Sequence, residues 1–157
     1  MSSVRFREAS AEEAEMIAGL IIRLKRLNEE FDSHLKVRED AHKNAVAYAR
    51  DSVNNDKVLL LVAEASNKLV GVIRAELRDR LFYDPPIAGV IVDFYLLPEY
   101  RRHGLGKRMI DEATQRLKKM GAQIIIAEFP LQNKIASSFY EKLGFRGTIG
   151  LYAREAR

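Results

Sequence analysis

The middle of the chain combines an apolar run, a basic glycine-containing loop and an amphipathic helix, between Val90 and Gly121. The run 90–97 is rich in β-branched and aromatic residues, which predicts a buried strand, and Pro98 ends it because proline has no N–H for a ladder. After the loop Arg101-Arg102-His103-Gly104-Leu105-Gly106, apolar residues recur every three to five positions, which predicts a helix that stops at Gly121. The free N–H groups and the dipole at a helix start favour an anion. The stretch therefore predicts a strand–loop–helix that holds an anionic ligand.

Composition narrows the class of protein. The 157 residues predict one domain, 1–157, and the 47% hydrophobic and 31% charged content is that of a soluble globular chain. No apolar run reaches the roughly 20 residues of a membrane span, and the charged start Met1 to Glu8 has no signal-peptide core. A cytoplasmic protein without a membrane partner is expected. The net charge of +4 is spread without a long basic run, so nucleic acid is not the expected partner.

The order of expected elements predicts an α/β fold. Periodicity predicts helices at 11–27, 39–52 and 133–143, the first introduced by a capping box at Ser10 and Glu13. Strands are expected at 4–7, 58–65, 69–77, 90–97, 124–127 and 145–153, with a loop at 78–87 because Pro85 and Pro86 cannot sit in a central ladder. This order implies a mixed sheet with helices on both faces.

Several known anion-binding and catalytic motifs are absent. A dinucleotide fingerprint needs a third glycine where Met109 stands, and a nucleoside-triphosphate loop needs Ser or Thr after its lysine, whereas Lys107 precedes Arg108. There is no Gly-x-Ser-x-Gly elbow. Without cysteine, and with His34, His42 and His103 at no ligand spacing, no metal site is expected.

Two motifs resemble those of the GNAT acetyltransferases. Arg101-x-x-Gly104-x-Gly106 follows a strand and opens a helix, and is similar to that family's coenzyme A pyrophosphate loop. Downstream, Asn133, Phe139-Tyr140 and Gly144-Phe145 resemble its second motif. The resemblance covers Val90 to Phe145 and implies a mostly antiparallel sheet of six to seven strands, whose fourth and fifth strands splay apart for acetyl-CoA.

The resemblance also implies roles for individual residues. The loop would bind the pyrophosphate, and Leu96 and Leu97 would offer main-chain groups to the pantetheine arm and an N–H to the thioester oxyanion. Tyr140 is implied as the proton donor to the CoA thiolate, and Asn133 as a contact of the CoA arm, although its position also suits a plain N-cap. The expected cofactor-binding residues are Leu96, Leu97, Arg101, Arg102, His103, Gly104, Leu105, Gly106, Lys107, Asn133 and Tyr140.

Asp93 is the only charged residue within its apolar run, and burial would raise the pKa of its carboxyl toward the range of a general base. Polyamine acetyltransferases of the family carry a Glu-Asp-Phe run at this point, whereas this chain has Val92-Asp93-Phe94. Asp93 is therefore expected either as the base, ahead of Glu76 and Glu128, or as a salt-bridged structural residue beneath the site, with a water chain removing the proton.

The expected reaction is transfer of an acetyl group from acetyl-CoA to a primary amine. A small cationic, polyamine-like acceptor is favoured because Glu29, Glu30, Asp32 and Asp84 are expected to line the entrance. The alternatives are a protein or peptide amine, including an α-amino terminus, and a CoA-binding module without catalysis. Family members often form homodimers, so a homodimer is compatible with the sequence, although no self-complementary patch is evident.

Overall fold

The computed structural model describes residues 3–157 and contains one five-stranded sheet with four α-helices and three short 3₁₀ turns among them. The elements follow the chain as β1 (Val4–Glu8), η1 (Ala11–Glu13), α1 (Ala14–Glu29), η2 (Ser33–Leu35), α2 (Ala41–Val53), β2 (Val58–Ala65), β3 (Lys68–Asp79), β4 (Ile87–Leu96), η3 (Pro98–Tyr100), α3 (Leu105–Lys119), β5 (Ile124–Ala127) and α4 (Lys134–Lys142).

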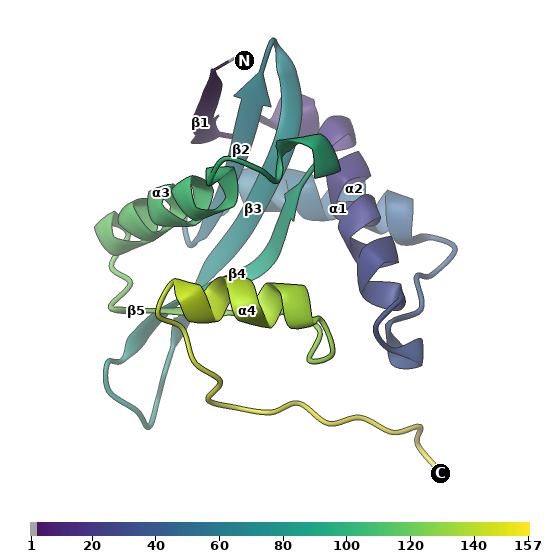
Figure 1. The fold of residues 1–157 in the computed structure, drawn as a ribbon, viewed down its shortest axis with the longest axis vertical. Coiled ribbons are helices and arrows are strands. Elements are labelled where there is room, and N and C mark those ends of the chain that lie inside the picture. Colours follow the sequence, from purple (N-terminus) through teal and green to yellow (C-terminus); the bar gives the residue numbers. More distant parts are fainter. Residues whose placement is uncertain (1–2) are drawn as a thin grey trace.

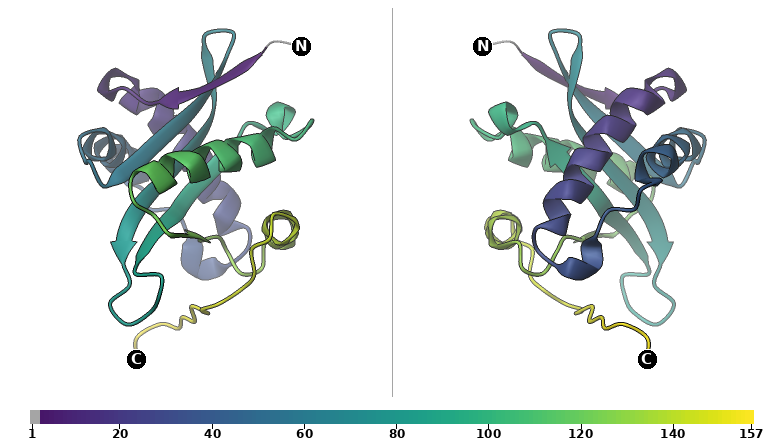
Figure 2. Two further views of the ribbon diagram at one scale, coloured as in Figure 1. Left: turned by 90° about the vertical axis from the view of Figure 1, so that its left-hand side faces the viewer. Right: turned by 90° about the vertical axis from the view of Figure 1, so that its right-hand side faces the viewer.

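The strands lie in sequence order, β1-β2-β3-β4-β5, and all neighbours are antiparallel except β4 and β5, which are parallel. Helices α1 and α2 cover one face of the sheet, and α3 and α4 cover the other (Figures 1 and 2). The parallel pair follows from α3, because a helical crossover returns the chain in the same direction. The predicted mixed sheet with helices on both faces is confirmed.

The predicted count of six to seven strands is wrong for the described residues, which form five. The difference is the segment 145–153, which was predicted as a final strand and has no regular secondary structure. An extended segment becomes a strand only when a neighbour accepts and donates its ladder hydrogen bonds, and this segment has no such neighbour among residues 3–157.

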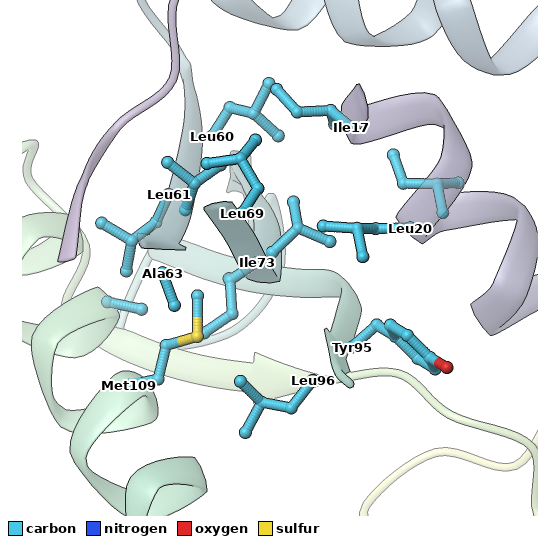
Figure 3. Close-up of a cluster of buried hydrophobic side chains, with 14 of the residues drawn as sticks. Ile17, Leu20, Leu60, Leu61, Ala63, Leu69, Ile73, Tyr95, Leu96 and Met109 are labelled. Carbon is cyan, nitrogen blue, oxygen red and sulfur yellow. The ribbon is translucent and has the colours of Figure 1, made fainter. Parts of the chain in front are cut away.

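The core lies on both faces of the central strands. Leu60, Leu61 and Ile73 from β2 and β3 are almost fully buried, which explains why β2 reads as a continuous apolar run rather than an alternating one. In Figure 3, Ile17 and Leu20 of α1 and Met109 of α3 lie around these strands. The sheet that carries β4 is therefore held firmly from both sides.

In the part of the chain that the structure describes, no helix is long and apolar enough to cross a membrane.

The start of the helical region is fixed to β1 by a charged cluster. The predicted capping box is present, with the Ser10 N–H donating to Glu13 Oε1 at 2.9 Å. Arg7 of β1 donates to both Glu13 oxygens, at 2.9 and 2.6 Å. The Arg7 hydrogen bond, joined by those from Ser10, lowers the pKa of Glu13 to about 2.

This shift predicts a pH dependence of stability. A carboxyl whose pKa is lower in the folded state stabilises the protein above its unfolded pKa of about 4.3, and that contribution is lost as the pH falls toward 2. Glu13→Gln should therefore reduce the loss of unfolding free energy between pH 5 and pH 2, in urea titrations at each pH. Glu12→Gln, one residue earlier and exposed, serves as the control. An unchanged acid limb in Glu13→Gln would contradict the assignment.

Candidate functional site

A β-bulge in β4 coincides with the point where β4 and β5 separate. Arg74 of β3 pairs with Asp93 and the next residue of β3, Ala75, pairs with Ile91, so Val92 is an extra residue in β4. Pairing with β5 ends at Ile91 and Ala127, followed by one further bond from the Glu128 N–H to the Ile91 carbonyl. Because a bulge bends and twists its strand, β4 turns away from β5 here. The predicted splay of these strands is present.

The bulge also reverses which side chains of β4 face which helices. A Cβ on Gly89 would meet Leu117 and Ala122, so Gly89 faces α3. Strict alternation would put Asp93 on that same face. Instead Asp93 contacts Lys25 of α1 and Tyr48 of α2, while Phe94 lies 5.9 Å from Phe139 of α4, measured between ring centroids. The extra residue thus places a carboxylate on one side of the strand and an aromatic ring on the other.

Beyond the bulge, β4 has an edge without a strand beside it. The Leu97 N–H donates to the Val70 carbonyl of β3 at 2.9 Å. In an antiparallel pair, alternate residues point their main-chain groups to opposite sides, so Phe94 and Leu96 direct theirs toward the gap left by β5. This corrects the expectation that Leu97 offers its amide to a ligand. Within the described part of the chain the Leu96 N–H has no acceptor, while its carbonyl accepts from Arg101 Nε at 2.8 Å.

The glycine loop presents main-chain N–H groups at the start of α3. His103 and Gly104 both have positive φ, 60° and 72°, a conformation that glycine adopts without strain. A Cβ at Gly104 would meet nothing within 4 Å, so the space above this residue is open. Within residues 3–157 no acceptor is found for the N–H groups of Arg102, His103, Gly104, Gly106 and Lys107, whereas that of Leu105 reaches the Arg102 carbonyl at 3.4 Å. These five donors and the helix dipole suit an anion.

The basic side chains of the loop differ in the contacts that they make within the chain. Arg101 stacks over the Tyr95 ring at 5.1 Å and holds the end of β4 through the Leu96 carbonyl, which gives it a structural contact. Lys107 pairs with Asp111 at 2.8 Å on the exposed surface of α3. Arg102 and His103 are exposed. The loop therefore has positive charge on its open side, to which the main-chain donors and Arg102 contribute.

Gly106 has a packing role that the sequence reading missed. A Cβ on Gly106 would lie 3.2 Å from Phe139 Cε1, so glycine lets α4 approach the start of α3 closely.

Asn133 caps α4, because its side-chain oxygen accepts from the Ala136 N–H at 3.0 Å. The plain N-cap reading of Asn133 is therefore realised, and its amide NH₂ remains available to contact a ligand. A cavity of about 370 Å³, lined in part by Lys107, Ile125 and Phe145, lies between α3 and the end of α4.

Tyr140 sits in an aromatic cluster beside the gap. Its ring stacks on Phe129, just past β5, at 5.1 Å, and meets Phe139 and Phe145 edge-on at 5.1 and 5.2 Å. Burial raises the pKa of the phenol, so the hydroxyl stays protonated at neutral pH. Among the described residues no group forms a hydrogen bond with this hydroxyl. Every fully buried side-chain polar atom of those residues does have a partner, so the unpartnered Tyr140 hydroxyl is not fully buried. It is thus an accessible proton donor.

Asp93 is buried, with 1% of its surface exposed, and both its oxygens are occupied. Lys25 Nζ donates to Oδ1 at 2.5 Å and the Tyr48 hydroxyl donates to Oδ2 at 2.6 Å. Burial, followed by the charge and hydrogen bond of Asp93, raises the pKa of the Tyr48 phenol, which therefore remains a donor. Of the two arrangements expected for Asp93, the structure has the salt-bridged one. Lys25 and Tyr48 were missed, although a lone acid in an apolar strand signals that a cation from a neighbouring helix must reach it.

The other two candidate bases belong to a surface chain of ion pairs. Arg74, stacked over the Tyr48 ring at 4.3 Å, donates to Glu76 at 2.6 Å. Arg78 in turn donates hydrogen bonds to Glu76 at 2.8 Å and to Glu128 at 3.1 Å, and so links the two carboxylates. Burial raises the pKa of Glu76, but the hydrogen bonds from Arg78 and Arg74 outweigh this effect and lower the pKa overall. Glu76 is therefore held ionised between two guanidinium groups rather than tuned as a base.

The predicted acidic lip is only partly assembled. Glu29 and Asp32 accept the N–H groups of Val37 and His34, at 2.6 and 2.8 Å, and with Glu30 they lie around the end of α1. Asp84 lies in the loop before β4, at the opposite end of that ten-residue strand from the glycine loop. At roughly 3.3 Å per residue this separates Asp84 from the loop by about 30 Å. In Figure 1 the loop that carries Asp84 also lies apart from the end of α1, so the structure does not bring Asp84 together with the other three carboxylates. No cluster of three metal-ligating side chains occurs among residues 3–157.

Comparisons with known proteins agree with this geometry. The sequence pattern of the Acetyltransferase (GNAT) family matches residues 23–145. N-alpha-acetyltransferase 30 of Schizosaccharomyces pombe is 36% identical over 59 residues, which are 38% of this chain and 39% of that protein. Spermidine N(1)-acetyltransferase of Thermoplasma acidophilum is 30% identical over 95 residues, 60% of this chain and 55% of that protein. The chain thus matches only about half or less of the length of these relatives.

The fold is also found among solved structures. The aminoglycoside N-acetyltransferase AAC(6')-Iy, solved in complex with CoA, superposes with a TM-score of 0.77 over 100% of this chain and 97% of that chain, at 19% identity. At this level of identity the likeness concerns the fold alone.

The buried carboxylate generates a prediction about stability. Asp93→Asn removes the anionic partner of Lys25 and Tyr48, so the unfolding free energy should fall by about 1.5–3 kcal/mol, the range for hydrogen bonds to charged groups. Urea unfolding with an unchanged m-value is the measurement. Asp111→Asn, which breaks only the exposed pair with Lys107, should change stability by less than about 0.5 kcal/mol. Equal stability of Asp93→Asn and the parent would refute the structural role.

Proposed function

The chain belongs to the Acetyltransferase (GNAT) family, and from this premise we propose that it is an N-acetyltransferase, acting as a single domain over residues 1–157, that transfers the acetyl group of acetyl-CoA to a primary amine. The observation that carries the proposal is the separation of β4 from β5 at Val92, directly beside a glycine loop rich in free N–H donors. A strand edge and an anion-binding helix start are the two features that a pantetheine arm and a pyrophosphate require.

The donor would lie across the end of β4. The N–H groups of Arg102 to Lys107, apart from Leu105, would bind the pyrophosphate oxygens, and the open space at Gly104 allows close approach of the ligand. The pantetheine arm would pair with main-chain groups of Phe94 and Leu96 in place of a strand. The free N–H of Leu96 is the group suited to polarise the thioester carbonyl and to stabilise the oxyanion.

In the reaction a neutral amine attacks the thioester carbonyl carbon, and the tetrahedral intermediate collapses by breaking the C–S bond. The sulfur leaves as a thiolate and takes one proton, while the attacking nitrogen releases one proton to water, and a proton from water restores the donor. Tyr140 is proposed to supply this proton, because its phenol is held protonated beside the gap and its hydroxyl is not used elsewhere.

The proton of the acceptor ammonium would pass to water rather than directly to Asp93. Both oxygens of Asp93 are bonded, to Lys25 and Tyr48, and a carboxylate in that state is a poor direct base. Asp93 would act as a positioning residue, which keeps Lys25 and Tyr48 in place on the α1–α2 side of β4.

The acceptor is proposed to be a small cationic amine that enters past the end of α1. Glu29 lies one helical turn beyond Lys25, and Glu30 and Asp32 follow, so negative charge borders the side of β4 that Asp93 faces. Partial similarity to a spermidine acetyltransferase supports this acceptor. A peptide α-amino group is the second candidate, supported by the similarity to an N-alpha-acetyltransferase.

Thermal unfolding with and without acetyl-CoA tests the donor site. A ligand that binds the native state raises the midpoint by mass action. Gly104→Val should abolish this rise, because a β-branched residue cannot hold the loop at a φ of 72°. Gly144→Val is the matched control, since Gly144 also has positive φ, 92°, and open space at its Cβ but lies after α4. It should lower stability and keep the rise. Equal ligand responses in both variants would show the loop to be misassigned.

Tyr140→Phe tests the proton donor. The variant keeps the aromatic stack and loses only the hydroxyl, so kcat should fall by about 10²–10⁴-fold while the Kd for CoA changes little. Phe129→Leu removes the stacking partner and keeps the hydroxyl, and it should retain more activity. Full turnover by Tyr140→Phe would exclude this residue from the mechanism.

A thiol-release assay across polyamines, aminoglycosides, amino acids and peptides tests the acceptor. For a cationic acceptor, Glu30→Lys should raise KM several-fold at low salt, because it reverses a charge at the proposed entrance. Asp84→Lys makes the same change in charge at the other end of β4 and should leave KM unchanged. Release with peptides alone would favour the second candidate. No release with any amine, despite CoA binding, would indicate a binding module without catalysis.

A further inference from the structure

A hollow lies between α1 and the segment that leads into α2. Its volume is about 280 Å³, and it is lined by residues of α1 between Gly19 and Arg26 and by residues from Val37 to His42. The right-hand view of Figure 2 shows α1 and α2 side by side on the outside of the sheet, on the face opposite α3 and its glycine loop. The hollow is therefore separate from the loop that is proposed to bind CoA.

The lining of the hollow is rich in positive charge. Arg23, Arg26 and Arg38 contribute guanidinium groups, against one carboxylate from Glu39. Within residues 3–157 no carboxylate forms a salt bridge with Arg23 or Arg26, and both side chains lie in exposed residues. A concave surface lined mainly by charge of one sign concentrates ions of the opposite sign. The hollow therefore attracts anions.

Two further basic side chains of the lining are held only by exposed ion pairs. Arg38 Nη2 lies 2.8 Å from Asp40 Oδ2, and His42 Nε2 lies 3.1 Å from Glu15 Oε2. All four side chains are largely exposed to water, where such pairs contribute little to stability. Arg38 and His42 can therefore turn toward a ligand in the hollow at little cost.

Gly19 keeps space open in the hollow. It lies inside α1, where glycine destabilises a helix relative to alanine. Its φ is not positive, and a Cβ built on it would meet no heavy atom within 4 Å, so neither backbone conformation nor close packing requires glycine here. Ile22, one turn further along α1, is buried and also lines the hollow. The missing side chain thus leaves room for a ligand beside the arginines.

We propose that this hollow is a second ligand site, which binds a compact dianionic oxyanion and bridges α1 to the segment before α2. Three arginines and one glutamate leave a net positive charge in the lining that a dianion neutralises. The planar guanidinium group donates two parallel N–H bonds to the oxygens of a phosphate or a carboxylate, so a phosphate ester and a small dicarboxylate share the required chemistry. The volume of about 280 Å³ lies just below the range of about 300–1,000 Å³ for pockets that take drug-sized ligands, which favours a small ligand.

Thermal unfolding with inorganic phosphate and with succinate, at matched ionic strength, tests the site. Saturating CoA keeps these anions away from the glycine loop, and the difference between variants isolates the hollow. At least one anion should raise the midpoint of the parent protein, and Arg26→Gln should weaken its Kd by about tenfold or more. Arg50→Gln removes the same charge from an exposed position of α2 outside the lining and should keep the parent Kd.

The larger response, to phosphate or to succinate, identifies the ligand as a phosphate ester or a dicarboxylate. No rise with either anion, or an equal loss in Arg26→Gln and Arg50→Gln, would overturn the proposal.

Filling the hollow without changing its charge distinguishes a built site from general attraction to a basic surface. Gly19→Leu places an aliphatic side chain in the space and should remove the response to the anion, while the far-UV spectrum stays helical because leucine favours helices more than glycine does. Gly19→Ala fills little of the space and should keep the response, with a higher midpoint in the absence of the anion. A full response in Gly19→Leu would place the anion elsewhere on the surface and contradict the assignment.

Discussion

The extra residue at Val92 in β4 is the constraint on which the rest of the site depends. Up to Ile91 the strand pairs with both neighbours, and beyond Val92 it keeps only β3. One inserted residue therefore ends the β4–β5 ladder, leaves the main chain of Phe94 and Leu96 open at the edge, and turns Asp93 to the face covered by α1 and α2. The donor and acceptor sides that we propose for the reaction are separated by this change in direction of a single strand.

The two faces of β4 are supported by different physical means. On the α3–α4 face the supports are apolar: Gly106 allows Phe139 to approach, and Phe139 contacts both Phe94 and Tyr140. On the α1–α2 face they are ionic, because buried Asp93 requires Lys25 and Tyr48 to compensate its charge. An apolar wall suits a pantetheine arm and keeps a phenol protonated, whereas the ion pair holds β4 to α1 and α2.

Sequence reasoning predicted the parts of the fold that follow local rules. The strands 58–65 and 124–127, the capping box at Ser10 and the glycine loop all depend on nearby residues, and they are found where they were predicted. The bulge, the Asp93–Lys25 pair and the contact between Gly106 and Phe139 depend on residues from distant segments, and no local pattern fixes them. The segment 145–153 shows the same limit, because it has a strand's pattern but strand formation requires a partner that the described residues do not place beside it.

We propose that the edge of β4 beyond the bulge, together with the glycine loop, receives coenzyme A. Residue-resolved amide hydrogen exchange with and without CoA tests this proposal. CoA should slow exchange at Phe94 and Leu96 and across Arg102 to Lys107, while Leu97, already bonded to Val70, should change little. Protection confined to other parts of the chain, or no protection at Leu96 under saturating CoA, would contradict it.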